Sequence, residues 1–189
     1  AAYKHITPNE RYPKEAIETN LIGLLNVIEQ GWGRFIFISS DKAVNSNSVM
    51  GITKRLGEVI VKNAGGISVR FGNVLGSRGS VIPLWQTSID RGEDLNVTDA
   101  RMTRYFMTIP EAVKLVIEAG EKGEPGSLWI MDMGTPVNIL QLAKDIIKES
   151  GKDVGIKMIG IRPGESLNEK LMMQEEEARA KKVGRFFVI

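Results

Sequence analysis

The 189-residue sequence is 42% hydrophobic and carries nearly balanced charge, with 25 Lys and Arg against 23 Asp and Glu. This composition is typical of a globular chain with a buried core, and a formal net charge of +2 argues against a nucleic-acid-binding protein. The chain has no cysteine and only one histidine, His5, so we expect no disulfide, no metal site and a cytoplasmic location. No apolar run approaches the roughly 20 residues of a membrane helix and no leader-like segment opens the chain, so we expect no membrane contact from it.

The predicted elements alternate between helix and strand, which indicates an α/β fold with a parallel sheet. Pro13 at a first turn begins a predicted helix that ends near Gly31. The apolar stripe of this helix consists of Ile17, Leu21, Leu24, Leu25 and Ile28. Residues 35–38 then predict a short strand buried on both faces, which ends at a polar turn.

A second helix is predicted from about residue 48 to residue 62, with Leu56, Val59 and Ile60 as its apolar positions. Residues 67–71 predict a second buried strand. Gly72, Gly76 and Gly79 punctuate the polar loop that follows. Glycine lets the backbone approach a ligand closely, so this loop is a candidate binding segment.

The second half of the chain again contains patterns typical of helices and strands. Thr108 and Glu111 have capping-box spacing and predict the start of a helix through Val113, Leu115 and Val116. Residues 128–131 predict a core strand, and residues 139–147 predict a helix capped near Asn138. The charged run 175–182 predicts a solvated helix. No repeat or long linker separates a second, independent domain.

Ser40, Asp41 and Lys42 directly follow the first predicted strand. Open α/β sheets place ligand-facing groups at the carboxyl ends of their strands, and here a proton donor adjoins a potential base. The competing interpretation is a turn held by local hydrogen bonds. Met50 and Lys54 lie one helical turn apart, a spacing that by itself also fits a core methionine beside a surface lysine.

Four segments, residues 40–45, 49–55, 69–81 and 102–106, occur in an order that carries a family resemblance. Together they resemble the inverting UDP-N-acetylglucosamine 4,6-dehydratases of the CapD-like capsular polysaccharide group, which are extended short-chain dehydrogenases/reductases. The resemblance covers nearly the whole chain and includes residues 1–5, 132–134, 162–165 and 187–189. It implies a Rossmann-like parallel sheet with a small C-terminal α/β substrate-binding region.

This family begins with a strand, a Gly-rich turn and a helix that hold the cofactor pyrophosphate, and no such glycine pattern precedes the first predicted helix. We therefore expect a fragment. Residues 1–75 would form the C-terminal half of the NADP-binding domain, and residues 76–189 would mainly bind the UDP-sugar, with some segments returning to the sheet. Short connections around residues 30–34 and 63–66 keep a compact homologue open as the alternative.

The resemblance also implies a role for individual residues. Lys4 would touch both NADP and the sugar nucleotide, and Lys54 would hold the nicotinamide ribose near Met50. The other expected cofactor contacts are Val74, Leu75, Gly76, Ser77 and Arg78. The expected substrate contacts are Asn73, Val81, Thr98, Arg162 and Glu165, with the planar donor fork of Arg162 suited to a diphosphate.

The implied reaction oxidises C4 of UDP-N-acetylglucosamine, removes water across C5 and C6, and returns the hydride to C6. Asp41, next to Ser40, would protonate the departing C6 hydroxyl, and Lys42 would take the C5 proton and return it on the opposite face. Met50 occupies the position of the usual catalytic Tyr, and a thioether cannot exchange a proton, so another group must be the C4-hydroxyl base. Such a Met occurs in a subgroup that often carries membrane helices, which would place a longer parent at the cytoplasmic face of a membrane.

Two alternatives stay open at this point. One is a UDP-sugar 4-epimerase of the same fold, although the adjacent Asp41 and Lys42 favour dehydration. The other is a non-catalytic nucleotide-sugar-binding module that binds UDP but not NADP. In each case the resemblance implies a homo-oligomer.

Overall fold

A five-stranded sheet forms the centre of the computed structural model, which describes residues 2–189. The strand order is β1 (Ile36–Ile38), β2 (Ile67–Arg70), β7 (Leu128–Met131), β11 (Phe186–Val188) and β10 (Lys181–Val183). The first three strands are parallel, with Ile36 opposite Ile67 and Val69 opposite Trp129. The last two form an antiparallel hairpin added to the far edge. The predicted parallel α/β sheet is therefore confirmed.

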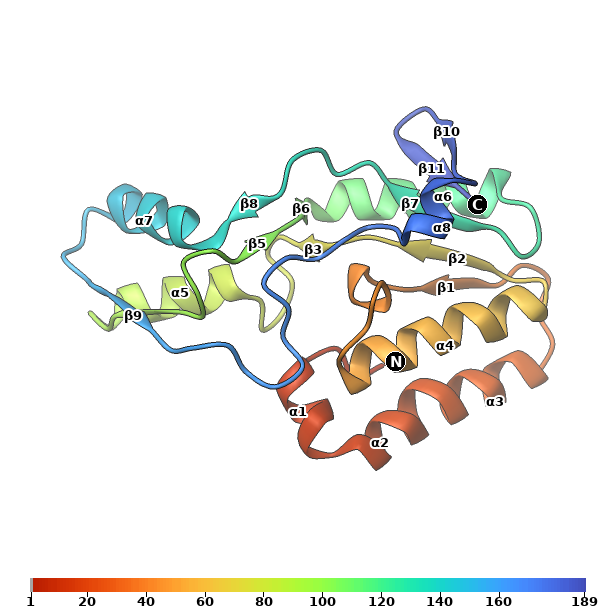
Figure 1. Ribbon diagram of the computed structural model, residues 1–189, viewed down its shortest axis with the longest axis horizontal. Coiled ribbons are helices and arrows are strands. Elements are labelled where there is room, and N and C mark those ends of the chain that lie inside the picture. Colours follow the sequence, from red (N-terminus) through yellow and green to blue (C-terminus); the bar gives the residue numbers. More distant parts are fainter. Residues whose placement is uncertain (1) are drawn as a thin grey trace.

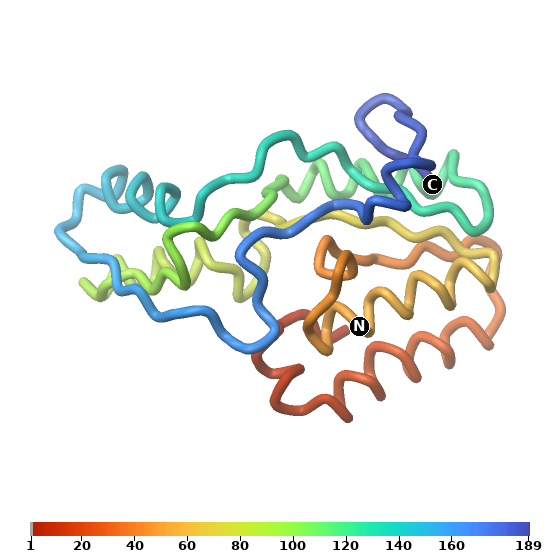
Figure 2. The backbone as a smooth tube through the Cα atoms, viewed as in Figure 1, coloured from red at the N-terminus to blue at the C-terminus, as the bar shows by residue number. Residues whose placement is uncertain are grey.

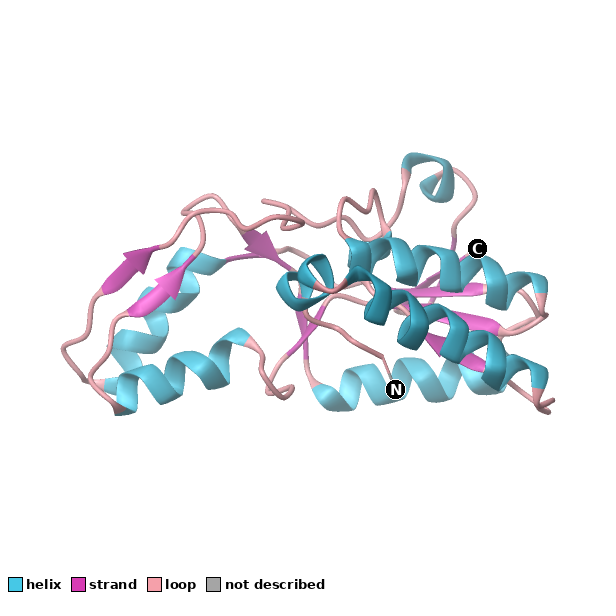
Figure 3. Cartoon of the chain, turned by 90° about the horizontal axis from the view of Figure 1, so that it is seen from below, coloured by secondary structure: helices cyan, strands magenta, loops and turns pink. Residues whose placement is uncertain are grey.

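Helices cover both faces of this sheet (Figures 1 and 3). On one face lie α4 (Val49–Asn63) and a longer helical run made of α2 (Pro13–Ile17), the π-helical turn η1 (Glu18–Ile22) and α3 (Gly23–Glu29). On the other face, α6 (Ile109–Lys122) packs on β1, β2 and β7. Buried side chains such as Val69, Leu115 and Trp129 join α6 to the sheet in one hydrophobic cluster.

The chain extends away from the sheet into a second lobe with its own buried cluster, built around Trp85, Leu95 and Ile139. Its helices are α5 (Val81–Asp90) and α7 (Ile139–Ser150), and β4 (Leu95–Val97) pairs in parallel with β9 (Ile156–Met158). Short strand pairs connect the lobe to the sheet: β3 (Asn73–Val74) with β6 (Phe106–Met107), and β5 (Thr103–Arg104) with β8 (Val137–Asn138). Beyond β9 the chain returns to the sheet, as the blue tube shows in Figure 2.

The remaining short helices lie beside this returning segment or at the ends of strands. α1 (Ile6–Arg11) precedes the long helical run, the 3-10 turn η2 (Asp41–Ala43) follows β1, and α8 (Gln174–Glu177) precedes the hairpin. Within residues 2–189, no helix combines the length and apolarity needed to cross a lipid bilayer.

The local signals for helix ends predicted the structure correctly. Thr108 and Glu111 form the capping box of α6, Ser48 caps α4, and the Asn138 side chain accepts a hydrogen bond from the Gln141 amide at the start of α7. Gly31 has φ of 77° just after α3, which is a left-handed conformation that glycine adopts without strain. These signals act within a few residues, so the sequence alone contains them.

Three expectations about burial were wrong. In the first helical run Leu21 and Leu24 are buried but Ile17 and Leu25 are exposed. The π-helical turn Glu18–Ile22 lies between Ile17 and Leu24, so residues before and after it do not share one face. In α4, Leu56 and Val59 are each 43% exposed. The buried face instead carries small residues, among them Gly57, where a Cβ would lie 2.5 Å from the Phe37 ring.

The third error concerns sheet edges. Ile38 is 42% exposed because β1 is an edge strand whose carboxyl end opens to solvent.

The predicted solvated helix over 175–182 was also wrong. Only α8 is helical there, and Lys181–Val183 forms strand β10. Glu176 is 2% exposed rather than solvated, because its carboxylate pairs with the buried Arg70. Pairing with distant partners overrides the helical preference of a charged run.

Candidate active site

A cavity of about 660 Å³, here called the site cavity, opens at the carboxyl ends of β1 and β2. Its wall brings together most of the residues singled out from the sequence, which come from the N-terminal segment, the turn after β1, α4, the glycine loop and the returning segment. These are Lys4, Ser40, Lys42, Met50, Lys54, Asn73, Val74, Leu75, Ser77, Val81, Arg162 and Glu165. Four predicted residues lie outside the wall: Asp41, Gly76, Arg78 and Thr98.

The N-terminal segment is held in place by buried amides. Asn20 accepts a hydrogen bond from the Tyr3 amide at 2.8 Å and donates to the Tyr3 carbonyl at 3.1 Å. The same Asn20 amide group donates to Thr53 Oγ1 on α4, so the extended segment is fixed against two helices. Lys4 therefore enters the site cavity from a supported backbone. Ala1, the first residue of this motif, lies outside the described residues.

The turn after β1 continues the register of the sheet. The Ser39 amide donates to the Val69 carbonyl at 2.7 Å and the Asp41 amide donates to the Phe71 carbonyl at 3.0 Å. The Ser40 hydroxyl accepts from the Lys42 amide and donates to Asp41 Oδ1 at 3.0 Å, so it caps η2. These contacts fix the three residues that the sequence predicted to be catalytic.

Asp41 and Lys42 form the central ion pair. Lys42 Nζ lies 3.0 Å from Asp41 Oδ1 and 3.2 Å from Asn73 Oδ1. Asp41 is fully buried, and its Oδ2 has no hydrogen-bond partner among residues 2–189. At Gly72 a Cβ would lie 2.9 Å from the Tyr105 carbonyl oxygen and 3.2 Å from Asp41 Oδ2, so the turn requires glycine there. Asp41, the expected acid, is thus buried behind Lys42, the expected base.

Met50 and Lys54 lie together on α4, as predicted. Met50 is 2% exposed, and Lys54 Nζ donates to the Ile38 carbonyl at 2.8 Å. The ammonium also lies 4.9 Å from the centre of the Phe37 ring. Burial lowers the pKa of Lys54, and Glu58 partly opposes that shift.

The glycine loop wraps one side of the site cavity. The Asn73 amide donates to the Tyr105 carbonyl and the Leu75 amide donates to the Met107 carbonyl, both at 2.8 Å. Gly76 and Gly79 each have φ of 71°, which turns the loop back toward α5. Gly76 and Arg78 are exposed at the outside of this turn, which is why they miss the cavity wall.

Sequence reasoning missed two ionisable residues of the wall, His5 and Arg104. Arg104 is buried and donates to the carbonyls of Ser166 and Leu167, which anchors the returning segment. Burial, and then the nearby Lys4, lower the pKa of His5. Both residues lie within motifs that carried the family resemblance, but no spacing rule assigned them a role.

The charge of the wall indicates the class of ligand. Five cations line it, namely Lys4, Lys42, Lys54, Arg104 and Arg162, against one carboxylate, Glu165. Arg162 and Glu165 lie 3.9 Å apart at the mouth. Ser80 Oγ on the same wall is buried without a partner among the described residues. A cation-rich cavity with unused hydroxyl groups suits a polyanion that carries hydroxyls, such as a nucleotide.

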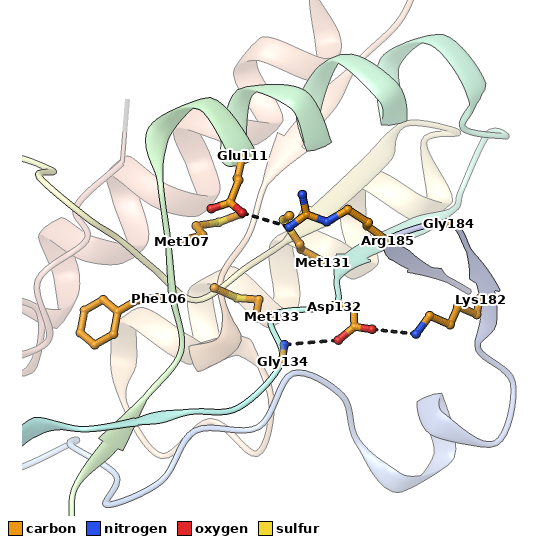
Figure 4. A pocket seen from close by; sticks show the side chains of 10 residues that line it. All are labelled: Phe106, Met107, Glu111, Met131, Asp132, Met133, Gly134, Lys182, Gly184 and Arg185. Carbon is orange, nitrogen blue, oxygen red and sulfur yellow. Dashed lines mark hydrogen bonds and ion pairs between the residues drawn. The ribbon is translucent and has the colours of Figure 1, made fainter.

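A second pocket of about 420 Å³, between α6 and the β10–β11 hairpin, has a different character (Figure 4). Its floor is formed by Met107, Met131 and Met133. Its charged groups neutralise each other in pairs, Glu111 with Arg185 at 3.0 Å and Asp132 with Lys182 at 2.8 Å. No charge is left over to bind an ion. Among residues 2–189, no group of three acidic or histidine side chains could hold a metal.

Comparison with known proteins places this chain in a family. The family model described as "Polysaccharide biosynthesis protein" matches residues 1–189. The chain belongs to this polysaccharide biosynthesis protein family. The capsular polysaccharide biosynthesis protein CapD of Staphylococcus aureus is 48% identical over 93% of this chain and 32% of its own length. The UDP-glucose 4-epimerase of Rickettsia canadensis is 36% identical over 100% of this chain and 59% of its own length.

Solved structures confirm the fold. Pen from Bacillus thuringiensis superposes with a TM-score of 0.96, is 35% identical and is covered over 63% of its chain, while all of this chain is covered. More distant structures that hold NAD or NADPH have TM-scores of 0.81 and 0.76 at 19% and 17% identity, which shows the shared fold. The family member described here thus spans about a third of CapD and under two thirds of Pen.

Proposed function

We propose that the protein is an NADP-dependent, C5-inverting UDP-N-acetylglucosamine 4,6-dehydratase that supplies a UDP-4-keto-6-deoxy sugar for capsule, O-antigen or flagellin-glycan synthesis. The observation that carries this proposal is the Asp41–Lys42 pair, with its Nζ–Oδ1 distance of 3.0 Å, in which Lys42 lines a cation-rich cavity and Asp41 lies directly behind it. An acid and a base on adjacent residues match the two proton transfers of an elimination across C5 and C6.

The residues present fit the nicotinamide half of the cofactor. Lys54 would hold the nicotinamide ribose, and Val74, Leu75 and Ser77 would contact the cofactor from the glycine loop. When bound, NADP would supply the hydride acceptor for C4 and return the hydride to C6. The pyrophosphate site would come from a Gly-rich segment outside this sequence, so residues 1–75 would form only part of the cofactor domain.

Residues of this chain would carry the proton transfers. Lys42, which lines the site cavity, would take the C5 proton as an amine and return it on the opposite face. Asp41 would protonate the departing C6 hydroxyl, and the Ser40 hydroxyl, hydrogen-bonded to Asp41 Oδ1, connects it to the cavity wall. Met50 would pack against the nicotinamide ring, since its thioether cannot act as a base.

Substrate contacts follow from position in the site cavity. Asn73 and Val81 would lie against the sugar, and Arg162 and Glu165 at the mouth would bind the diphosphate and the ribose. Thr98 follows β4 outside the wall, so its contact would require the nucleotide to extend beyond the mouth. Residues 76–189 would therefore form most of the UDP-sugar site, with β7, β10 and β11 returning to the sheet.

The runner-up is a UDP-sugar 4-epimerase, which the 36% identity to the Rickettsia canadensis epimerase supports. An epimerase has no use for an acid–base pair at C5 and C6. We further propose a cytoplasmic homo-oligomer, assembled through the apolar side chains Leu25, Ile52, Leu56 and Val59, which are exposed on the outer helices α3 and α4.

The test uses the natural full-length protein with NADP+ and UDP-N-acetylglucosamine, with products followed by mass spectrometry and NMR. We expect a product lighter by one water, with a C4 ketone and a C6 methyl group. Asp41→Asn and Lys42→Met should each reduce kcat by roughly 10²-fold or more while UDP binding persists. A product of unchanged mass with inverted C4 would support the epimerase, and UDP binding without any product would support the non-catalytic module.

A further inference from the structure

Glu169 is a nearly buried carboxylate beside the proposed catalytic pair. It lies on the returning segment, where Asn168 pairs with Thr103 of β5, and its side chain is 5% exposed. Its Oε1 lies 3.9 Å from Lys42 Nζ and 3.7 Å from Arg104. Both distances exceed hydrogen-bonding range, and no described residue donates a hydrogen bond to this carboxylate. The sequence analysis assigned it no role.

Asp41, in contrast, is sealed from solvent. It is 0% exposed, and its polar contacts are to Ser40 and Lys42. In the proposed reaction Asp41 gives a proton to the leaving hydroxyl, and Lys42 later returns its own proton to C5. Each turnover therefore ends with Asp41 as a carboxylate and Lys42 as an amine. The proton that restores Asp41 has to pass through one of its two neighbours.

We propose that Glu169 restores Asp41 by passing a proton through Lys42. Once the Lys42 side chain shortens its 3.9 Å separation from Glu169 Oε1 to hydrogen-bonding distance, the protonated Glu169 carboxyl gives its proton to the Lys42 amine, and the resulting ammonium gives a proton to the Asp41 carboxylate. The net change is one proton from Glu169 to Asp41, and solvent then reprotonates Glu169 through the 5% of its side chain that is exposed. Glu169 acts through Lys42, so it is a positioning residue that holds a proton. This inference rests on the proposed function.

The surroundings of Glu169 favour the protonated form of its carboxyl group. The charged groups that face it are Lys42, Asp41, Arg104 and Glu165. Burial raises the pKa of Glu169, and the anionic neighbours Asp41 and Glu165 also raise it, whereas Lys42 and Arg104 act in the opposite direction.

Rapid-quench kinetics of the full-length protein with NADP+ and UDP-N-acetylglucosamine test this inference. In Glu169→Gln, an isostere that cannot release a proton, the first turnover should match wild type, and later turnovers should be slower by roughly 10²-fold. A burst of one product per site, absent from wild type, is therefore expected with KM unchanged. Wild-type kcat should fall as pH rises past the pKa of Glu169, and the variant should lose that dependence. The exposed Glu177→Gln is the matched control.

Several results would overturn the inference. Glu169→Gln without a burst would show that Asp41 is restored through Ser40, and equal slowing of all turnovers with a raised KM would show a structural role. If Glu169→Gln folds poorly, Glu169→Asp must restore multiple turnovers. In the unloaded protein, carbon-13 NMR should show the Glu169 carboxyl titrating at higher pH after Lys42→Met, and no change would contradict the contact. Absence of product from wild type would overturn the proposed function as well, whereas the other results concern Glu169 alone.

Discussion

At the scale of single residues, the burial of a side chain, more than its residue type, decides its contribution to this site. Asp41 and Lys42 are adjacent in sequence, yet Asp41 is 0% exposed while Lys42 lines the site cavity. Met50, at 2% exposure, is as buried as a core residue although it occupies a cavity wall. Met50 therefore contributes by filling space in the cavity wall.

If Met50 only fills space, the effect of Met50→Leu can be predicted. Leucine has nearly the same volume and no sulfur, so the substitution should cost less than about 1.5 kcal/mol of stability and leave kcat within roughly threefold of wild type. Steady-state kinetics and thermal unfolding would measure both. A loss of 10²-fold in kcat with unchanged stability would show instead that the sulfur atom takes part in the chemistry.

At the scale of elements, a buried ionic network joins the C-terminal helix to the sheet. Arg70 of β2 is 0% exposed and donates to both carboxylate oxygens of Glu58 on α4, at 2.9 and 2.6 Å, and of Glu176 on α8, at 2.7 and 3.0 Å. Glu58 also accepts a hydrogen bond from the Ser39 hydroxyl, just before η2. α8 is too short to be stable alone, so this network holds it in place.

Removing one member of the network should be costly. We expect Glu176→Gln to lower the free energy of unfolding by about 3 kcal/mol, because a buried guanidinium loses a charged partner. Urea denaturation followed by circular dichroism would measure the change. The neighbouring, exposed Glu177→Gln should stay within about 0.5 kcal/mol of wild type. Equal effects of the two variants would contradict the assignment.

The capping box of α6 predicts a dependence on pH. The Thr108 backbone amide, then Arg185, hold the pKa of Glu111 at about 2, below its ordinary value of 4.5. Because the folded-state pKa is depressed, the carboxylate stabilises the fold above about pH 4.5, and this stabilisation is lost as pH falls toward 2. Glu111→Gln should therefore be less stable than wild type at pH 6, with the difference disappearing near pH 2. Thermal unfolding across this range would show it, and a constant difference would be evidence against the cap.

The elements also show what could be predicted from sequence. Strand positions and helix caps follow local rules, so Thr108, Asn138 and Ser48 were predictable. The buried face of α4 could not be predicted in this way, because it depends on the contact between Gly57 of α4 and the Phe37 ring of β1. Strand β10 depends on pairing with β11, which no local pattern of residues 175–182 reveals.

For the candidate site, the family resemblance predicted most of the residues that line the site cavity. It could not predict how deeply each side chain is buried. The burial of Asp41 depends on the close approach of Gly72, which follows β2 and has Tyr105 packed against it. Glu169 lies near both Lys42 and Arg104 only because the returning segment runs beside β5. Such contacts arise from tertiary structure, and no spacing along the chain encodes them.

At the scale of the whole molecule, the exposed apolar side chains of α3 and α4 predict self-association. Leu56→Lys should convert the proposed oligomer to a monomer, because a charge at the centre of an apolar interface cannot be buried without a partner. Light scattering coupled to size-exclusion chromatography would measure the mass. Met158→Lys, an equally exposed apolar position on β9 in the other lobe, should leave the mass unchanged. A monomer in wild type, or an oligomer in both variants, would refute this interface.

The open edge of the sheet has a further consequence for anyone who produces these 189 residues by themselves. Strand β1 exposes one row of backbone donors and acceptors beside Ile38, and the exposed Ile109, Val113 and Ile117 of α6 form an apolar stripe on the helix that packs on it. An uncovered hydrophobic strand edge is a template for aggregation. The isolated piece should therefore precipitate or require a solubilising fusion, whereas a chain that adds a strand along β1 should remain dispersed at high concentration.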